Sequence, residues 1–127
     1  VQQCLFSMIE EGRDRTAFHL RIGTILAQKW QDAGEDEKDR ALRGNTLVLA
    51  ADHLNLGCSL IEKKDKLLEL ARLNLHAGKW TLRQSAFASS AAYLRQGKKI
   101  LEEQAPDMWS THYDLTLELC GTLGYLE

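Results

Sequence analysis

Residues 67–101 constrain the fold of this chain more than any other part of the sequence. Apolar residues recur there at spacings of three and four, the spacing of a buried helix face. Two such rows run side by side in the first half: Leu68, Ala71, Leu75 and Gly78 in one, and Leu70, Leu73 and Ala77 in the other. A helix that is apolar over so much of its circumference has neighbours on more than one side. We therefore predict two antiparallel helices, joined at residues 78–81, inside a larger helical array.

Small residues mark the places where these helices are expected to approach one another closely. Ala88 and Ala92 share one face of the second helix, and Tyr93 or Leu94 is expected to fill the adjoining gap. Gly78 and, further upstream, Gly23 stand on apolar rows in the same way. Because a larger side chain would overpack such a crossing, Ala92→Leu is expected to cost about 1–3 kcal/mol of stability.

Helical periodicity continues through the rest of the chain, interrupted by glycines or charged turns. The expected helices outside the central hairpin span residues 1–10, 15–33, 39–61 and 108–126. Residues 1–12 are expected to be the tail of a helix that begins upstream and is broken at 11–14. The sequence thus predicts one all-α domain, 1–127, with about six helices in antiparallel hairpins. The array is expected to be a right-handed superhelix like that of tetratricopeptide repeats.

Length and composition indicate one ordinary domain. The chain of 127 residues is long enough for a single core. No apolar run approaches the roughly 20 residues needed to cross a bilayer. Three cysteines, Cys4, Cys58 and Cys120, are an odd number without paired spacing, which favours reduced thiols in the cytoplasm. Because the sequence starts without methionine inside an expected helix, we interpret it as a cytoplasmic fragment of a larger multidomain protein.

The sequence contains no motif for catalysis, cofactor binding or metal binding. Gly78 and Lys79 lack the upstream glycine and the following hydroxyl of a phosphate-binding loop. The four histidines and three cysteines show neither His-x3-His nor Cys-x2-Cys spacing. An isoelectric point of about 6.1 and an acidic C-terminal part argue against nucleic acid as a partner. We therefore expect no enzyme activity, cofactor or metal; the alternative is a small helical enzyme or ligand carrier with a His/Cys pocket.

Charge is distributed unevenly, although the net charge is only −2. Residues 62–99 hold nine Lys/Arg and three Asp/Glu, or +6, whereas residues 100–127 hold six Asp/Glu and no Lys/Arg, or −6. Consecutive helices are normally adjacent in space, so some of these charges should pair within the fold. Arg72, Arg83 and Arg95 are expected to stay unpaired. Together with His76 they form the candidate interaction surface, for an acidic segment of a neighbouring domain.

The order of several short motifs resembles that of a known protein family. The motifs are HLRIG at 19–23, HLNLG at 53–57, LARLNLHAG at 70–78, SAF at 85–87 and, near the end, Trp109 and Tyr113. This series is similar to the helical region that follows the ATPase core of STAND-type signalling ATPases. Those large proteins are fused to serine/threonine-kinase-like and sensor histidine-kinase modules.

The resemblance implies a non-catalytic helical-repeat scaffold or sensor module for signal transduction, with the ATPase and kinase activities elsewhere in the parent protein. Its partners would be other domains of the same chain or separate proteins, and neither nucleic acid nor a membrane. The resemblance also implies a structural role for Asn55, Gly57, Asn74 and Trp109.

Overall fold

The protein consists of helices in every part that the structure describes. The computed structural model describes residues 2–33 and 40–127, and residues 2–10 by their backbone alone. The elements are α1 (Gln2–Asp32), α2 (Arg40–Gly57), the short 3-10 helix η2 (Cys58–Leu60), α3 (Lys64–Arg83), α4 (Phe87–Gln104), α5 (Met108–Thr111) and α6 (Tyr113–Leu126). Within these two ranges there is no strand. The prediction of an all-α fold with about six helices is confirmed.

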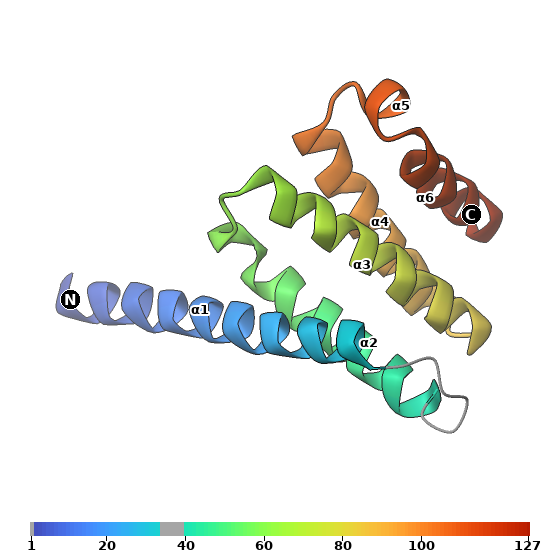
Figure 1. Cartoon of the computed structure of the whole chain (residues 1–127). Helices are drawn as coiled ribbons and strands as arrows, with labels where there is room; N and C mark the ends of the chain where they lie inside the picture. The colour runs from blue at the N-terminus through green and yellow to red at the C-terminus, as the bar shows by residue number, and fades with distance from the viewer. Residues whose placement is uncertain (1, 34–39) are drawn as a thin grey trace.

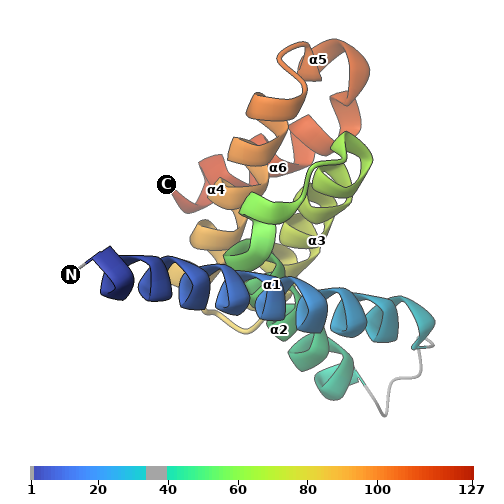
Figure 2. The ribbon, with the colours of Figure 1, turned by 90° about the vertical axis from the view of Figure 1, so that its left-hand side faces the viewer.

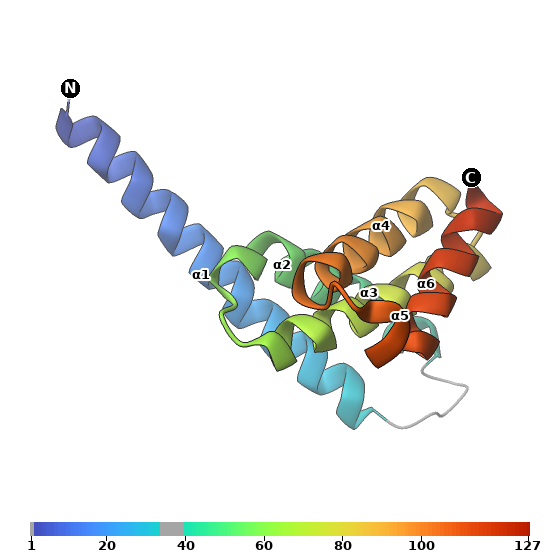
Figure 3. The same ribbon diagram turned by 90° about the horizontal axis from the view of Figure 1, so that it is seen from above.

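The helices form two hairpins and a C-terminal helix (Figure 1). α1 packs on α2, α3 packs on α4, and the hairpins meet through α2 and α3. α6 lies against α4, so α1 and α6 stand at opposite ends of the stack, as Figure 2 also shows. The N-terminal part of α1 extends beyond the other helices (Figure 3). This order of hairpins agrees with the expected array, whereas its right-handed superhelical form stays a prediction.

The predicted helix break at residues 11–14 is wrong, because α1 runs without interruption from Gln2 to Asp32. Gly12 lies inside this helix, and the Thr16 hydroxyl donates a hydrogen bond of 2.8 Å to its carbonyl oxygen. One glycine in a helix interior costs only about 1 kcal/mol relative to alanine. That penalty is smaller than the stabilisation that a long helix gains by packing along α2.

The predicted turn at residues 78–81 is also wrong, since α3 continues to Arg83 and the connection is 84–86. The helix ends where Ser85 adopts a positive φ of 60°. The Ser85 and Ala86 amides then donate to the carbonyl oxygens of Leu82 and Thr81, the two bonds of a Schellman motif. Glycine usually takes this left-handed position, so a serine there gave no signal of the turn.

The buried face of α4 is not the one predicted from its alanines. Ala88 and Ala92 are exposed to solvent and lie at no helix crossing. The face that packs on α3 consists of Ser90, Ala91, Leu94 and Gly97. Two small-residue faces stand side by side on this helix, and composition does not distinguish between them. Of the small residues predicted at close contacts, Gly23 is buried against Leu54 and Gly78 against Leu94.

Two neighbouring alanines of α4 should therefore respond oppositely to enlargement. Ala91→Leu is expected to lower the free energy of unfolding by about 1–3 kcal/mol, because Ala91 is 8% exposed and its surroundings are filled. Ala92→Leu is expected to change it by less than about 0.5 kcal/mol, because position 92 faces solvent. Urea denaturation of both variants measures the difference. Equal effects would contradict this register of α4.

Buried polar side chains join neighbouring helices, both between the hairpins and within the second one, and set their register. The side-chain amides of Asn55 and Asn74 exchange two hydrogen bonds of 2.8 and 2.9 Å between α2 and α3. Asn74 is fully buried and also donates to the carbonyl oxygen of Leu70. The Ser90 hydroxyl donates to the Gly78 carbonyl oxygen at 2.8 Å, between α4 and α3. These buried groups are fully hydrogen-bonded, so they specify the packing without leaving an unsatisfied donor or acceptor.

The C-terminal helix is apolar on two opposite faces, of which one is buried. Leu115, Leu119 and Leu123 are at most 6% exposed. Trp109, for which a structural role was expected, lies in α5 and is 51% exposed, so it is not part of the core. Tyr113, its neighbour, is 54% exposed. The core thus continues into α6 through one leucine row only.

Candidate functional site

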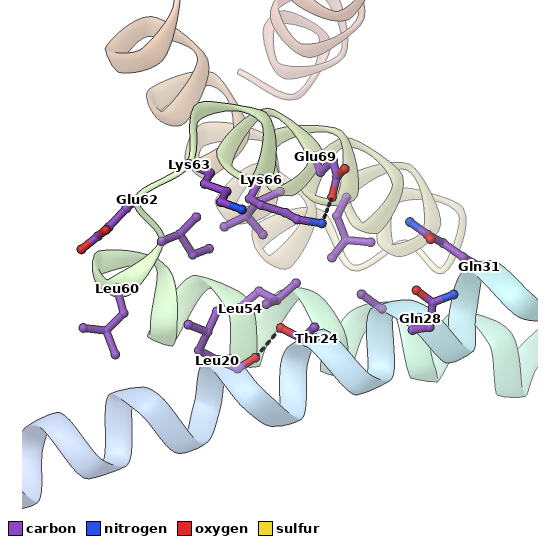
Figure 4. A pocket seen from close by; sticks show the side chains of 14 residues that line it. Leu20, Thr24, Gln28, Gln31, Leu54, Leu60, Glu62, Lys63, Lys66 and Glu69 are labelled. Carbon is purple, nitrogen blue, oxygen red and sulfur yellow. Dashed lines mark hydrogen bonds and ion pairs between the residues drawn. The ribbon is translucent and has the colours of Figure 1, made fainter.

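A groove opens between α1 and α3, with α2 and η2 at its floor (Figure 4). It has a volume of about 520 Å³, which is the size of pockets that hold a small molecule or several side chains. Its apolar lining includes leucines from each of these elements. They are Leu20 of α1, Leu54 of α2, Leu60 of η2, and Leu70 and Leu73 of α3. We call this feature the α1–α3 groove.

Polar side chains stand along both lips of the α1–α3 groove. Thr24, Gln28 and Gln31 come from α1, and Lys63, Lys66 and Glu69 come from the start of α3 and the residue before it. The ammonium of Lys66 lies 3.5 Å from the carboxylate of Glu69. An apolar floor between polar lips suits an amphipathic ligand, whose apolar side can be desolvated while its polar side stays in water.

Two close contacts between α1 and α2 determine how far the groove opens. A Cβ added at Gly23 would lie 2.8 Å from the backbone nitrogen of Leu54, and one at Gly57 would lie 2.7 Å from that of Leu20. These glycines therefore let the two backbones approach closely, so α1 packs directly on α2. The connection through η2 and residues 61–63 then carries the chain away, and α3 packs on α2 rather than on α1. The space left between α1 and α3 is the groove.

The four residues of the predicted interaction surface do not form one patch. Arg72, His76 and Arg83 lie on a common face of α3, because they are four and seven residues apart. Arg72 and Arg83 are exposed. Arg95 lies on α4, where its guanidinium donates two hydrogen bonds of 3.0 and 2.8 Å to Glu127. The expectation that Arg95 stays unpaired is wrong, and we exclude it from the surface.

The expected pairing between the two charge blocks is confirmed. Lys79 pairs with Glu118, Arg95 with Glu127 at 2.8 Å, and Lys98 with Glu102 at 3.8 Å. Each pair joins a residue of 62–99 to one of 100–127. All of these side chains are substantially exposed, so each pair contributes only about 0–1 kcal/mol.

His76 joins α3 to the first hairpin through aromatic contact. Its ring lies 5.2 Å from that of Trp30, centroid to centroid. The Arg43 guanidinium lies 5.0 Å from the centroid of the Trp30 ring, in cation–π geometry, and its Nε donates to the Trp30 carbonyl oxygen at 3.4 Å. Partial burial, and next the charge of Lys79, lower the pKa of His76 below its ordinary 6.5. The folded state thus favours the neutral imidazole.

This lowered pKa makes stability depend on pH. Below about pH 6.5 the unfolded chain binds a proton at His76 more readily than the folded chain does, so the free energy of unfolding should fall as pH falls. His76→Gln should reduce this pH dependence between pH 7 and 5, because glutamine does not titrate. Denaturation at a series of pH values measures both slopes. An identical slope in the variant would show that other groups cause the dependence.

Other side chains with titratable groups also form contacts between helices. Nδ1 of His19 and Nδ1 of His53 lie 2.9 Å apart, one from α1 and one from α2. The Tyr93 hydroxyl donates to Asp52 at 2.6 Å, and burial together with this bond raises the pKa of Tyr93. Tyr93 therefore joins α4 to α2, whereas Leu94, the other residue expected beside the alanines, is fully buried.

No cluster of three or more His, Cys, Asp or Glu that could hold a metal ion occurs among the described residues. Cys58 and Cys120 are free thiols there, and the side chain of Cys4 lies outside the described part. In that same part of the chain, no helix has the length and apolar character needed to span a membrane.

Several residues of the α1–α3 groove were not singled out from the sequence. Lys63 and Lys66 lie between the expected helices, in a stretch that reads as an ordinary charged turn, and Leu60 lies near the end of the expected helix 39–61. The only available signal was the spacing of Leu20, Thr24, Ala27 and Gln31 along one side of α1. Comparison of the chain with models of protein families, with curated proteins and with solved structures finds no match.

Proposed function

We propose that this chain is a non-catalytic helical-repeat module of a larger signalling protein, whose α1–α3 groove binds a segment of another domain or partner protein. The observation that carries the proposal is the open, leucine-floored groove of about 520 Å³ between two hairpins. In arrays of helical hairpins, surfaces of this kind receive extended or helical peptide segments. The proposal also includes a relationship to the helical region of STAND-type signalling ATPases, a right-handed superhelical form and a cytoplasmic location.

Charge near the groove favours an acidic segment. α3 carries five Lys/Arg and only two Asp/Glu. Two lysines and two glutamates line the groove itself. The excess positive charge lies further along α3, where Arg72 and Arg83 are exposed. The partner segment would thus place apolar side chains on the leucines and carboxylates towards α3, whose positive potential also accelerates association.

A pair of synthetic helical peptides tests this proposal. Both have about 18 residues, long enough to be helical, and the same leucine face; one carries glutamate and the other lysine on its polar face. The glutamate peptide is expected to bind, and Leu60→Asp should weaken it at least about tenfold, which corresponds to ~1.4 kcal/mol. Fluorescence polarisation measures the dissociation constants.

Leu56→Asp provides the matched control, because Leu56 is 61% exposed on α2 and does not line the groove. It should leave the affinity unchanged. Equal binding of the glutamate peptide to the Leu60→Asp variant and the unmodified chain would overturn the groove as the binding site. The alternative function, a small ligand carrier or enzyme with a His/Cys pocket, instead predicts tight binding of a nucleotide, metal or metabolite in isothermal titration.

A further inference from the structure

The outer face of α5 and α6 is an apolar surface that no other described element covers. Trp109, Tyr113 and Leu117 are about half exposed, and Tyr125 is 83% exposed. On α6 these residues lie opposite the leucine row that packs on the second hairpin. The Trp109 and Tyr113 rings lie 6.1 Å apart and form a continuous aromatic patch. We call this surface the α5–α6 face.

The backbone of α6 is accessible in the middle of the α5–α6 face. A Cβ added at Gly121 or Gly124 would meet no atom within 4 Å. Both glycines share the face of Leu117, since they follow it by four and seven residues. A second helix can therefore approach α6 closely between Leu117 and Tyr125. Isolated glycines in an exposed helix lower its stability by about 1 kcal/mol each, and no contact inside the described chain compensates for them.

The charged groups that flank this face without an ion pair are acidic. Residues 100–127 contain six Asp/Glu and no Lys/Arg. Glu102, Glu118 and Glu127 pair with basic residues of the second hairpin. Asp107 and Asp114 are exposed and form no ion pair with any other residue that the structure describes. Asp107 directly precedes α5, and Asp114 lies one turn before Leu117, so carboxylates flank the apolar surface.

We propose that the α5–α6 face binds a cationic amphipathic helix of a partner protein. Its apolar side would cover Tyr113, Leu117 and Tyr125, and its lysines or arginines would meet Asp107 and Asp114. Exposed aromatic rings add to this preference, because cations bind over their faces. The carboxylates disfavour anionic partners such as nucleic acid or an acidic lipid surface. This site lies apart from the α1–α3 groove and binds the opposite charge, so it goes beyond the function proposed above.

The lysine peptide described above is the probe for this face. It is expected to bind the intact chain, and the glutamate peptide is expected to bind only the groove. Gly121→Gln should lower the affinity of the lysine peptide at least about tenfold, or ~1.4 kcal/mol, because the new side chain blocks the close approach of a helix. Replacing Asp107 and Asp114 together by asparagine should weaken it and reduce the dependence of its affinity on salt.

Gly12→Gln is the matched control, because a Cβ at Gly12 also meets no atom within 4 Å but lies on α1. Gly12→Gln and Leu60→Asp should both leave the affinity of the lysine peptide unchanged, so loss of the groove and loss of this face are distinguishable. Circular dichroism checks that the variants remain helical. Unchanged binding of the lysine peptide to the Gly121→Gln variant would overturn the proposal. The proposal would also be overturned if the chain self-associates in analytical ultracentrifugation and Gly121→Gln abolishes this self-association. The occupant of the face would then be a second copy of the chain.

Discussion

Gly57→Ala is expected to lower the free energy of unfolding by about 1–3 kcal/mol. Gly57 ends α2 where α1 crosses it, and an added Cβ would lie 2.7 Å from the nitrogen and 2.8 Å from the Cα of Leu20. These are backbone atoms, so no rotation of a side chain relieves the clash and α1 must move. Chemical denaturation measures the loss. The slope of the unfolding free energy against denaturant concentration should be the same in the variant and the parent.

Gly12→Ala is the control for this prediction, and it should have the opposite sign. Gly12 lies inside α1 with open space around its Cα. Alanine is the better helix former by about 0.5–1 kcal/mol, so this variant should be more stable than the parent. If Gly57→Ala were also stabilising, the close crossing of α1 and α2 would be wrong. The shape of the α1–α3 groove depends on that crossing.

Asn74→Leu is expected to destabilise the protein by about 1–3 kcal/mol, because it leaves the partly buried amide of Asn55 without its partner. Asn74 is fully buried, so water cannot replace the lost bonds at its own position. Leucine has a similar size, which limits the effect of a cavity. Thermal or chemical unfolding of the single variant measures the loss.

The double variant Asn55→Leu/Asn74→Leu shows whether the pair acts as a unit. Replacing both polar groups by apolar ones of similar shape removes the unsatisfied amide, so the double variant should be more stable than Asn74→Leu alone. The coupling energy in this double-mutant cycle should be about 0.5–3 kcal/mol. Simple additivity of the two substitutions would show that the pair is not a coupled contact between α2 and α3.

The sequence marked the residues at these helix contacts in two ways. Gly23 stood on an apolar row, and a glycine there indicates a close approach of another helix, which the structure confirms at Leu54. Asn55, Gly57 and Asn74 stood out only through the family resemblance, because a buried amide leaves no trace in hydrophobic periodicity. The partner of each residue became known only from the fold, since Asn55 and Asn74 are on different helices.

The sequence by itself determined that this chain is helical and where most apolar rows lie, because the spacing of three and four residues follows from the geometry of a single helix. It also determined that residues 62–99 and 100–127 would share ion pairs, because adjacent segments of opposite charge meet when they pack.

Only the tertiary structure decided which of two similar faces is buried. Ser90 and Ala91, not Ala88 and Ala92, face α3, and one apolar face of α6 packs while the other stays in solvent. Both outcomes depend on the distances between the helices. These distances are set by the close contacts at glycines and by the end of α3 at Ser85. The two candidate binding surfaces arise in the same way, because a groove or an uncovered face is defined by which neighbour a helix lacks, and no local spacing contains that information.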